Sequence, residues 1–305
     1  RIPNIIINIM FCLGSLVFIL PFVLIISASF SDEQTLLSEG YKLIPSVFST
    51  EAYKYVFRNP QQLLDSYKVT IIYSIVATVL GVVVMAMLAY PLSRKGLKGS
   101  KIVNLFCVIT MYLNLGTTFF IFFTMLFSGG LIPTYIWITR YLHLGDTIWV
   151  YILPCLVNAF HVIVIRSFFQ GLPQALMESA KIDGASELQT FFKIVMPLSK
   201  PVIATIALLT LLSRWNDWNT ALIYIKSSNL YSLQYLLQKI LREAEFVKNM
   251  ADSSPVTGVD LDLSNLPSVT IRFAMCMVAA GPMLIIFPFF QKYFAKGLTV
   301  GAVKG

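Results

Sequence analysis

The sequence predicts an all-α integral membrane protein with six transmembrane helices and both chain ends in the cytoplasm. Of its 305 residues, 57% are hydrophobic and only 12% are charged, whereas soluble domains carry about 25% charged residues. The apolar residues form long runs without the alternating pattern of a membrane β-strand, which favours helices. Basic residues gather between particular runs, and this distribution sets the orientation.

Six apolar runs are long enough for a bilayer core, which takes about 20 helical residues to cross. We expect one transmembrane domain over residues 1–305, with spans at about 5–30, 68–93, 102–127, 147–170, 201–225 and 268–294. The first run is too long for the core of a signal peptide, so we predict a retained span. Pro154 and Asn158 in the fourth run, and Gly281-Pro282 in the sixth, are typical of broken or kinked spans.

The loop after the second span, "SRKGLKGSK", contains four basic residues, Arg94, Lys95, Lys98 and Lys101, and no acidic one. With the N-terminus inside, basic residues outnumber acidic ones in the internal segments, and acidic residues slightly outnumber basic ones outside. The net charge of +8 is then explained by the anionic inner leaflet of the lipid membrane, and no nucleic-acid partner is predicted.

The four cysteines, Cys12, Cys107, Cys155 and Cys276, lie within apolar runs and show no metal-binding spacing with each other or with histidine. We interpret them as small hydrophobic side chains. The sequence therefore predicts neither a metal site nor a disulfide framework.

Outside the spans, two segments are predicted to be helical. The segment "TYIWITRYL" has the aromatic content of a helix at the membrane interface. The large external loop, residues 226–267, contains "LYSLQYLLQKILREAEF", whose apolar residues have helical spacing. This loop is either a passive connector or a docking element for an outside partner. Residues 295–305 form a cytoplasmic tail whose glycines permit an extended conformation.

A polar insert, residues 171–200, separates the fourth and fifth runs. We predict two amphipathic helices, "PQALMESAKI" and "SELQTFFKIVM", separated by a turn at Asp183-Gly184, where glycine tolerates the required conformation. The first helix is expected to place Leu176, Ala180 and Ile182 near one face. Because an apolar stripe is not stable in water, the insert must rest on the membrane or in a groove of a soluble partner.

The insert resembles the EAA signature, EAA-x3-G-x9-I-x-L-P, of permease subunits in ATP-binding-cassette (ABC) importers. Here the pattern runs from Glu178 to Gly184, continues through nine residues, and ends from Ile194 to Pro197. Ser179 replaces the first alanine, and methionine replaces the leucine before the proline; both changes keep size or hydrophobic character. The "RWNDWNTAL" stretch and the C-terminal "KGLTVGAVKG" extend the resemblance to the carbohydrate-uptake branch over the whole chain.

The resemblance implies a type I ABC importer permease fold in a bacterial inner membrane. It implies a coupling helix seated on an ATPase subunit, with a C-terminal tail that reaches the same interface; a plain interfacial linker is the alternative. The coupling residues would be Glu178, Ser179, Ala180, Asp183, Gly184, Ile194 and Pro197. The implied partners are a homologous second permease in a heterodimer, two ATPase subunits that bind ATP and magnesium, and an extracytoplasmic sugar-binding protein.

The sequence contains no phosphate-binding motif of the G-x-x-x-x-G-K-[ST] type, and "GLKGSK" lacks the spacing. The chain is therefore expected to be a non-catalytic subunit that binds no cofactor of its own. The alternative is an ion-coupled secondary sugar transporter that uses Arg214 and Asp217, since charges within a membrane are costly. These two residues can also form a structural ion pair, and six spans without a repeated half argue against the usual secondary transporters.

Sugar hydroxyls bind amide and phenol groups, and sugar rings stack on aromatic side chains. By this chemistry, the candidates for the substrate path are Tyr112, Asn114, Asn158, Arg214, Trp215, Asn216, Asp217 and Trp218. Each of them can instead bond between helices or face lipid. An unpaired Arg214 would favour an acidic oligosaccharide.

Overall fold

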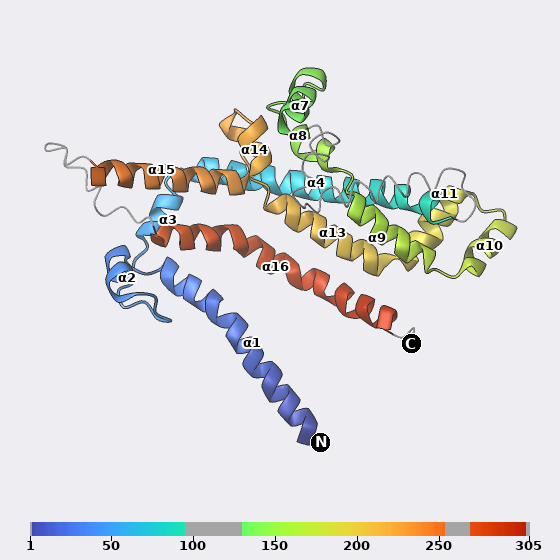
Figure 1. Ribbon diagram of the computed structural model, residues 1–305, viewed down its shortest axis with the longest axis horizontal. Helices are drawn as coiled ribbons and strands as arrows, with labels where there is room; N and C mark the ends of the chain where they lie inside the picture. The colour runs from blue at the N-terminus through green and yellow to red at the C-terminus, as the bar shows by residue number, and fades with distance from the viewer. Residues whose placement is uncertain (1, 95–129, 254–268, 303–305) are drawn as a thin grey trace, which may run out of the picture. The chain divides into compact units, whose positions relative to one another are not determined.

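The computed structural model describes residues 2–94, 130–253 and 269–302 (Figure 1). These residues are mainly helical, and their sole β pairing is an isolated bridge between Ser31 and Phe48. The predicted span at 102–127 lies outside the described residues. By its contacts the chain divides into two compact units: residues 1–65 with 233–285, and residues 66–232 with 286–305.

Three helices are individually long and apolar enough to cross a membrane, and two bent helix pairs raise this number to five within the described residues. The three are α1 (Ile2–Ser29), α4 (Pro60–Ser93) and α16 (Val269–Ala302). Helix α4 begins earlier than the predicted residue 68, because proline is well suited to a first helical position. Helix α16 continues beyond residue 294, so the predicted tail is helical as far as Ala302.

The first unit contains two short helices, α2 (Glu33–Glu39) and α3 (Glu51–Val56). Glu33 begins α2 and joins it to the start of α16. Its buried carboxylate accepts hydrogen bonds from the backbone N–H groups of Val269 and Thr270 and from the Thr270 hydroxyl, each at 2.9 Å. A negative charge is stabilising at a helix N-terminus, where these N–H groups have no partner within the helix.

The first unit also contains α15 (Leu233–Ser253), which confirms the predicted amphipathic helix. Leu233, Leu236, Leu237 and Ala244 are buried along one face, whereas Phe246 is exposed. The spacing of the buried residues is that of neighbours on one helix surface.

In the second unit, the predicted fourth span is broken. It consists of α8 (Trp149–Ile152), η2 (Leu153–Cys155) and α9 (Ala159–Gln170), with a bend of 51° at residues 156–158. The Asn158 side chain caps α9 by accepting a hydrogen bond from the backbone N–H of His161 at 3.2 Å. This cap begins a new helix, which accounts for the break near Pro154.

The predicted fifth span is also divided. Helix α13 (Lys200–Trp215) ends well before residue 225, and α14 (Asn219–Tyr224) follows as a separate short helix. Asn216 donates its side-chain N–H to the Leu212 carbonyl, and Asp217 accepts the backbone N–H of Thr220. Such side-chain bonds to the backbone compete with the helix and favour its end at this point.

Helix α7 (Leu131–Ile136) and the π-helical turn η1 (Trp137–Tyr141) cover the predicted interface helix. Trp137 and Tyr141 are exposed, and Ile138 is buried. A 3-10 turn, η4 (Ser228–Leu230), follows α14. The hydrophobic core of the second unit is formed by α4, α9, α13 and the insert between the last two, and α9 and α13 run side by side (Figure 1).

Candidate functional site

The insert at residues 171–200, here called the elbow, is a helix–turn–helix. Its first arm is α10 (Gln174–Ile182). At the turn, the Gly184 N–H donates to the Lys181 carbonyl at 3.2 Å, and the Ala185 N–H donates to the Ala180 carbonyl at 2.9 Å. This pair of bonds is a Schellman motif, which places its glycine in the left-handed region; Gly184 has a φ of 76°. The predicted turn is confirmed.

The packed face of α10 differs from the prediction. Met177 and Ala180, three residues apart, are buried against the core. Ala180 was expected there, but Ile182 was placed on this face wrongly and is 86% exposed; Leu176, one helical turn before Ala180, is 43% exposed. The reason is helical geometry, because two residues at about 100° each place Ile182 nearly opposite Ala180.

The second arm begins with a capping box. The Ser186 hydroxyl accepts the Gln189 N–H at 3.3 Å, and the Gln189 side chain accepts the Ser186 N–H at 2.9 Å. Helix α11 (Glu187–Thr190), the π-helical turn η3 (Phe191–Val195) and α12 (Met196–Leu198) follow without a gap. The arm then meets α13 at an angle of 81°. Two reciprocal bonds at the start fix where the arm leaves the turn.

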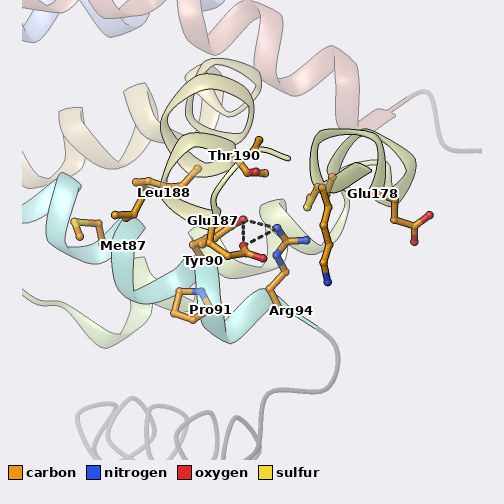
Figure 2. Close-up of a pocket in the computed structure, with 12 residues that line it drawn as sticks. Met87, Tyr90, Pro91, Arg94, Glu178, Glu187, Leu188 and Thr190 are labelled. Carbon is orange, nitrogen blue, oxygen red and sulfur yellow. Dashed lines mark hydrogen bonds and ion pairs between the residues drawn. The ribbon is translucent and has the colours of Figure 1, made fainter. Parts of the chain in front are cut away.

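Between the elbow and the end of α4 lies a cavity of about 680 Å³ (Figure 2). Apolar side chains form one part of its wall and charged side chains another. The lining residues are Met87, Tyr90, Pro91, Arg94, Met177, Glu178, Lys181, Ala185, Glu187, Leu188, Thr190 and Phe191. The volume of this cavity therefore depends on the position of the elbow relative to the end of α4.

Three polar side chains meet across this cavity. The Tyr90 hydroxyl donates to the Glu187 carboxylate at 2.7 Å, and the Arg94 guanidinium donates to the same oxygen at 3.1 Å (Figure 2). Arg94 also donates to the Tyr90 oxygen, and its Cζ lies 4.8 Å from the centre of the Tyr90 ring. We call Tyr90, Arg94 and Glu187 the polar cluster. It joins α4 to the second arm of the elbow.

A second contact joins α4 to the helix that precedes the elbow. The Nε of Arg166, on α9, donates to the Leu92 carbonyl at 3.0 Å. Leu92 lies in the last turn of α4, where carbonyl groups have no partner within the helix. A cation is stabilising at this end of the helix dipole.

The structure places the predicted coupling residues on both arms. Glu178, Ser179 and Asp183 are exposed on the first arm, and Ala180 is buried. The Glu178 carboxylate points away from the polar cluster (Figure 2). On the second arm, Ile194 is half-buried and Pro197 is exposed. All of these residues lie on the elbow, and their role in coupling stays a prediction.

The predicted path residues fall into separate groups. Arg214, Trp215, Asn216, Asp217 and Trp218 lie together where α13 gives way to α14. Arg214 and Asp217 form an ion pair at 3.8 Å, and both are largely buried. Trp215 is buried, and Trp218 is 37% exposed.

Asn158 lies at the break of the fourth span, and Tyr112 and Asn114 lie outside the described residues. The path role of the whole set stays a prediction. Among the residues that the structure describes, no group of His, Cys, Asp and Glu side chains has the arrangement of a metal site.

Sequence reasoning missed the polar cluster and Arg166. The motif "SELQ" is a capping-box signature and indicates that a helix starts at Glu187. No pattern in the sequence pairs Glu187 with Arg94, because the contact joins positions 93 residues apart.

Comparison with known proteins places these features in a family. Residues 77–300 match the family described as "Binding-protein-dependent transport system inner membrane component". Protein LplC of Bacillus subtilis (strain 168) is 40% identical, over 98% of this chain and 94% of that protein. A second protein from this strain, the polygalacturonan/rhamnogalacturonan transport system permease protein YtcP, is 36% identical, over 95% of this chain and 94% of that protein.

A solved structure has the same fold. It is the crystal structure of a bacterial ABC transporter involved in the import of the acidic polysaccharide alginate, with a TM-score of 0.70 and 26% identity. The alignment covers 96% of this chain and 97% of the matched chain. With a family match over most of its length, this chain belongs to the inner-membrane permease components of binding-protein-dependent ABC transport systems.

Proposed function

We propose that this chain forms half of the translocation path of an ATP-driven importer for oligosaccharides. All six predicted spans cross the membrane, and both chain ends lie in the cytoplasm. A homologous permease forms the other half of the path. Two ATPase subunits bind ATP and magnesium on the cytoplasmic side, and an extracytoplasmic protein delivers the sugar.

The elbow is the observation that carries this proposal. Met177 and Ala180 anchor one face of α10 on the core, while Ile182 leaves its side chain 86% exposed at the end of the same helix. An exposed apolar residue beside charged Glu178 and Lys181 has the character of an interface with a soluble partner. The ATPase is the partner we assign, because the chain has no nucleotide-binding motif of its own.

The names of similar proteins support a carbohydrate as the solute. One relative is a polygalacturonan/rhamnogalacturonan transport permease, and the matched structure is an importer of an acidic polysaccharide. We extend this to acidic oligosaccharides for the present chain. Trp218, which is 37% exposed, is an aromatic side chain of the kind on which a sugar can stack.

The ion-coupled alternative depends on Arg214 and Asp217. These residues already pair with each other, and Asp217 also accepts the backbone N–H and the hydroxyl of Thr220 at 3.0 Å and 2.7 Å. A carboxylate with this many partners is well suited to holding the start of α14. The arrangement favours a structural pair over an ion-coupling site.

The coupling role is tested in the assembled transporter by Glu178→Lys and Gly184→Val. The first reverses a charge on the exposed face of α10. The second forces a β-branched residue into the left-handed region, which costs about 1–2 kcal/mol. We expect solute uptake to fall at least about tenfold while membrane insertion stays normal, because a perturbation of about 1.4 kcal/mol corresponds to a tenfold change in rate.

Gly184→Asn is the matched control, since asparagine adopts the left-handed conformation more readily than other side chains. It is expected to retain most of the uptake. Normal accumulation of solute in both Glu178→Lys and Gly184→Val, with the protein present in the membrane, would refute the coupling role.

A further inference from the structure

The two contacts at the end of α4 lie on opposite sides of the elbow's turn in the sequence. Arg166 precedes the elbow on α9, and Glu187 follows the turn on α11. Both reach the last turns of one helix, at Leu92 and at Tyr90 with Arg94. The intervening chain therefore cannot shift as a whole without straining a contact to α4.

The polar cluster is more specific than an ordinary surface ion pair. The side chains of Arg94 and Glu187 are 32% and 71% exposed, and a pair with that exposure is worth little alone. The Tyr90 residue, however, is only 8% exposed, and its hydroxyl both donates to Glu187 and accepts from Arg94. The buried ring thus fixes the position of the Tyr90 hydroxyl oxygen, and both charged side chains bond to that oxygen.

Packing around Tyr90 supports the same contact. Its ring lies 5.2 Å, centre to centre, from the ring of Phe191, which is buried on the second arm. Met177 and Val195 belong to the same buried core as Tyr90 and Leu92. Because a close-packed core has low compressibility, a displacement of either arm is passed on to α4.

We propose that Tyr90, Arg94, Glu187 and Arg166 form a clamp that transmits movement of the elbow to α4 and so to the translocation path. They act as positioning residues for transport. This inference rests on the proposed function, since the movement is supplied by the ATPase. Packed side chains and polar contacts can carry coupling between two elements, and these contacts form such a network. Its role depends on whether the members act together.

The test uses the complete transporter in proteoliposomes with its binding protein. The measured quantity is the amount of solute transported per ATP hydrolysed, because a lost clamp uncouples movement from hydrolysis, whereas lost folding lowers both. Tyr90→Phe, Arg94→Gln and Glu187→Gln are each expected to lower this ratio at least about threefold. Arg166→Gln is expected to act in the same direction.

A double-mutant cycle tests whether the cluster acts as a unit. Tyr90→Phe combined with Glu187→Gln is expected to lower the ratio no further than the more severe single change, since either change already breaks the shared contact. The charge exchange Arg94→Glu with Glu187→Arg is expected to recover part of the ratio that Arg94→Glu alone loses. Tyr90→Phe keeps the packed aromatic ring. It therefore still tests the clamp if a charge variant fails to assemble.

Glu51→Gln is the matched control, because it removes the carboxylate of a more exposed ion pair, Lys54–Glu51 at 2.7 Å. It is expected to leave the ratio unchanged. The clamp is overturned if Tyr90→Phe and Glu187→Gln retain the wild-type ratio, or if their effects are additive. That result, with uptake still lost in Glu178→Lys, would leave the proposed function intact and remove only the clamp.

Discussion

At the residue scale, the Asp146 side chain joins the segment before α8 to the segment after α14. Its carboxylate accepts the backbone N–H groups of Lys226 and Ser227 at 2.9 Å each, and the Ser227 hydroxyl at 2.6 Å. Its own N–H donates to the Tyr224 carbonyl at 2.9 Å. Asp146 and His143 have positive φ values of 56° and 50°, and the four hydrogen bonds offset the resulting strain.

These bonds hold the pKa of Asp146 below its usual range, chiefly through the Ser227 hydroxyl and backbone. Since the folded pKa is depressed, the stabilisation is fully present above the ordinary aspartate pKa of about 3.9. It is lost as the pH falls through the lower folded value. At neutral pH the contribution is complete.

We predict that Asp146→Asn lowers the free energy of unfolding by about 1 kcal/mol at neutral pH, since it weakens charge-assisted hydrogen bonds at a partly exposed site. Thermal unfolding of the purified protein measures this change. The difference in the free energy of unfolding between the variant and wild type should disappear as the pH falls below about 4. Equal melting temperatures at pH 7 would contradict the assignment.

At the scale of elements, two backbones approach closely where the fourth span is broken. A Cβ atom added to Gly81, on α4, would lie 3.1 Å from the backbone oxygen of Leu156. Leu156 stands at the bend between η2 and α9. Glycine at residue 81 therefore lets α4 contact the broken span where a larger residue would push it away.

We predict that Gly81→Ala destabilises the protein by about 1–3 kcal/mol, because the added methyl group meets backbone that cannot rotate away. Gly14→Ala, within α1, is the matched control, since its added Cβ would meet no atom within 4 Å outside its own stretch of helix. The control should gain stability through helix propensity. Thermal unfolding of both variants decides the point; stabilisation by Gly81→Ala would show that the contact is loose.

At the scale of the whole molecule, the chain is an inner-membrane permease component of a binding-protein-dependent transport system. The structure shows helices for crossing the membrane and an elbow with an exposed apolar end, and the sequence contains no phosphate-binding motif. Under the proposed function, the energy for transport comes from a partner that binds and hydrolyses nucleotide. The Arg214–Asp217 pair is the feature that would contradict this view if it coupled ions.

We predict that vesicles containing this chain and the proposed second permease, without ATPase subunits, accumulate no solute against a gradient. Addition of the ATPase subunits, ATP and the binding protein should restore accumulation. An ATPase that binds but does not hydrolyse ATP serves as the control. Uphill accumulation driven by an ion gradient in the absence of any ATPase would favour the secondary-transporter alternative.

Local chemistry made much of the fold predictable. The apolar runs indicated α1, α4 and α16, and the helical spacing of leucines indicated α15. The Asp183-Gly184 step predicted the turn of the elbow, because its bonds join residues within five positions of one another. Such features depend on neighbours along the chain and are therefore visible in the order of the residues.

Other features were decided by packing. The sequence alone determined the helical class, the membrane location and the turn of the elbow. The tertiary structure decided which face of α10 is buried, where the fourth and fifth spans break, and that Glu187 meets Arg94. The physical reason is that helix periodicity shows which residues share a face, while the neighbour that covers this face comes from a distant part of the chain.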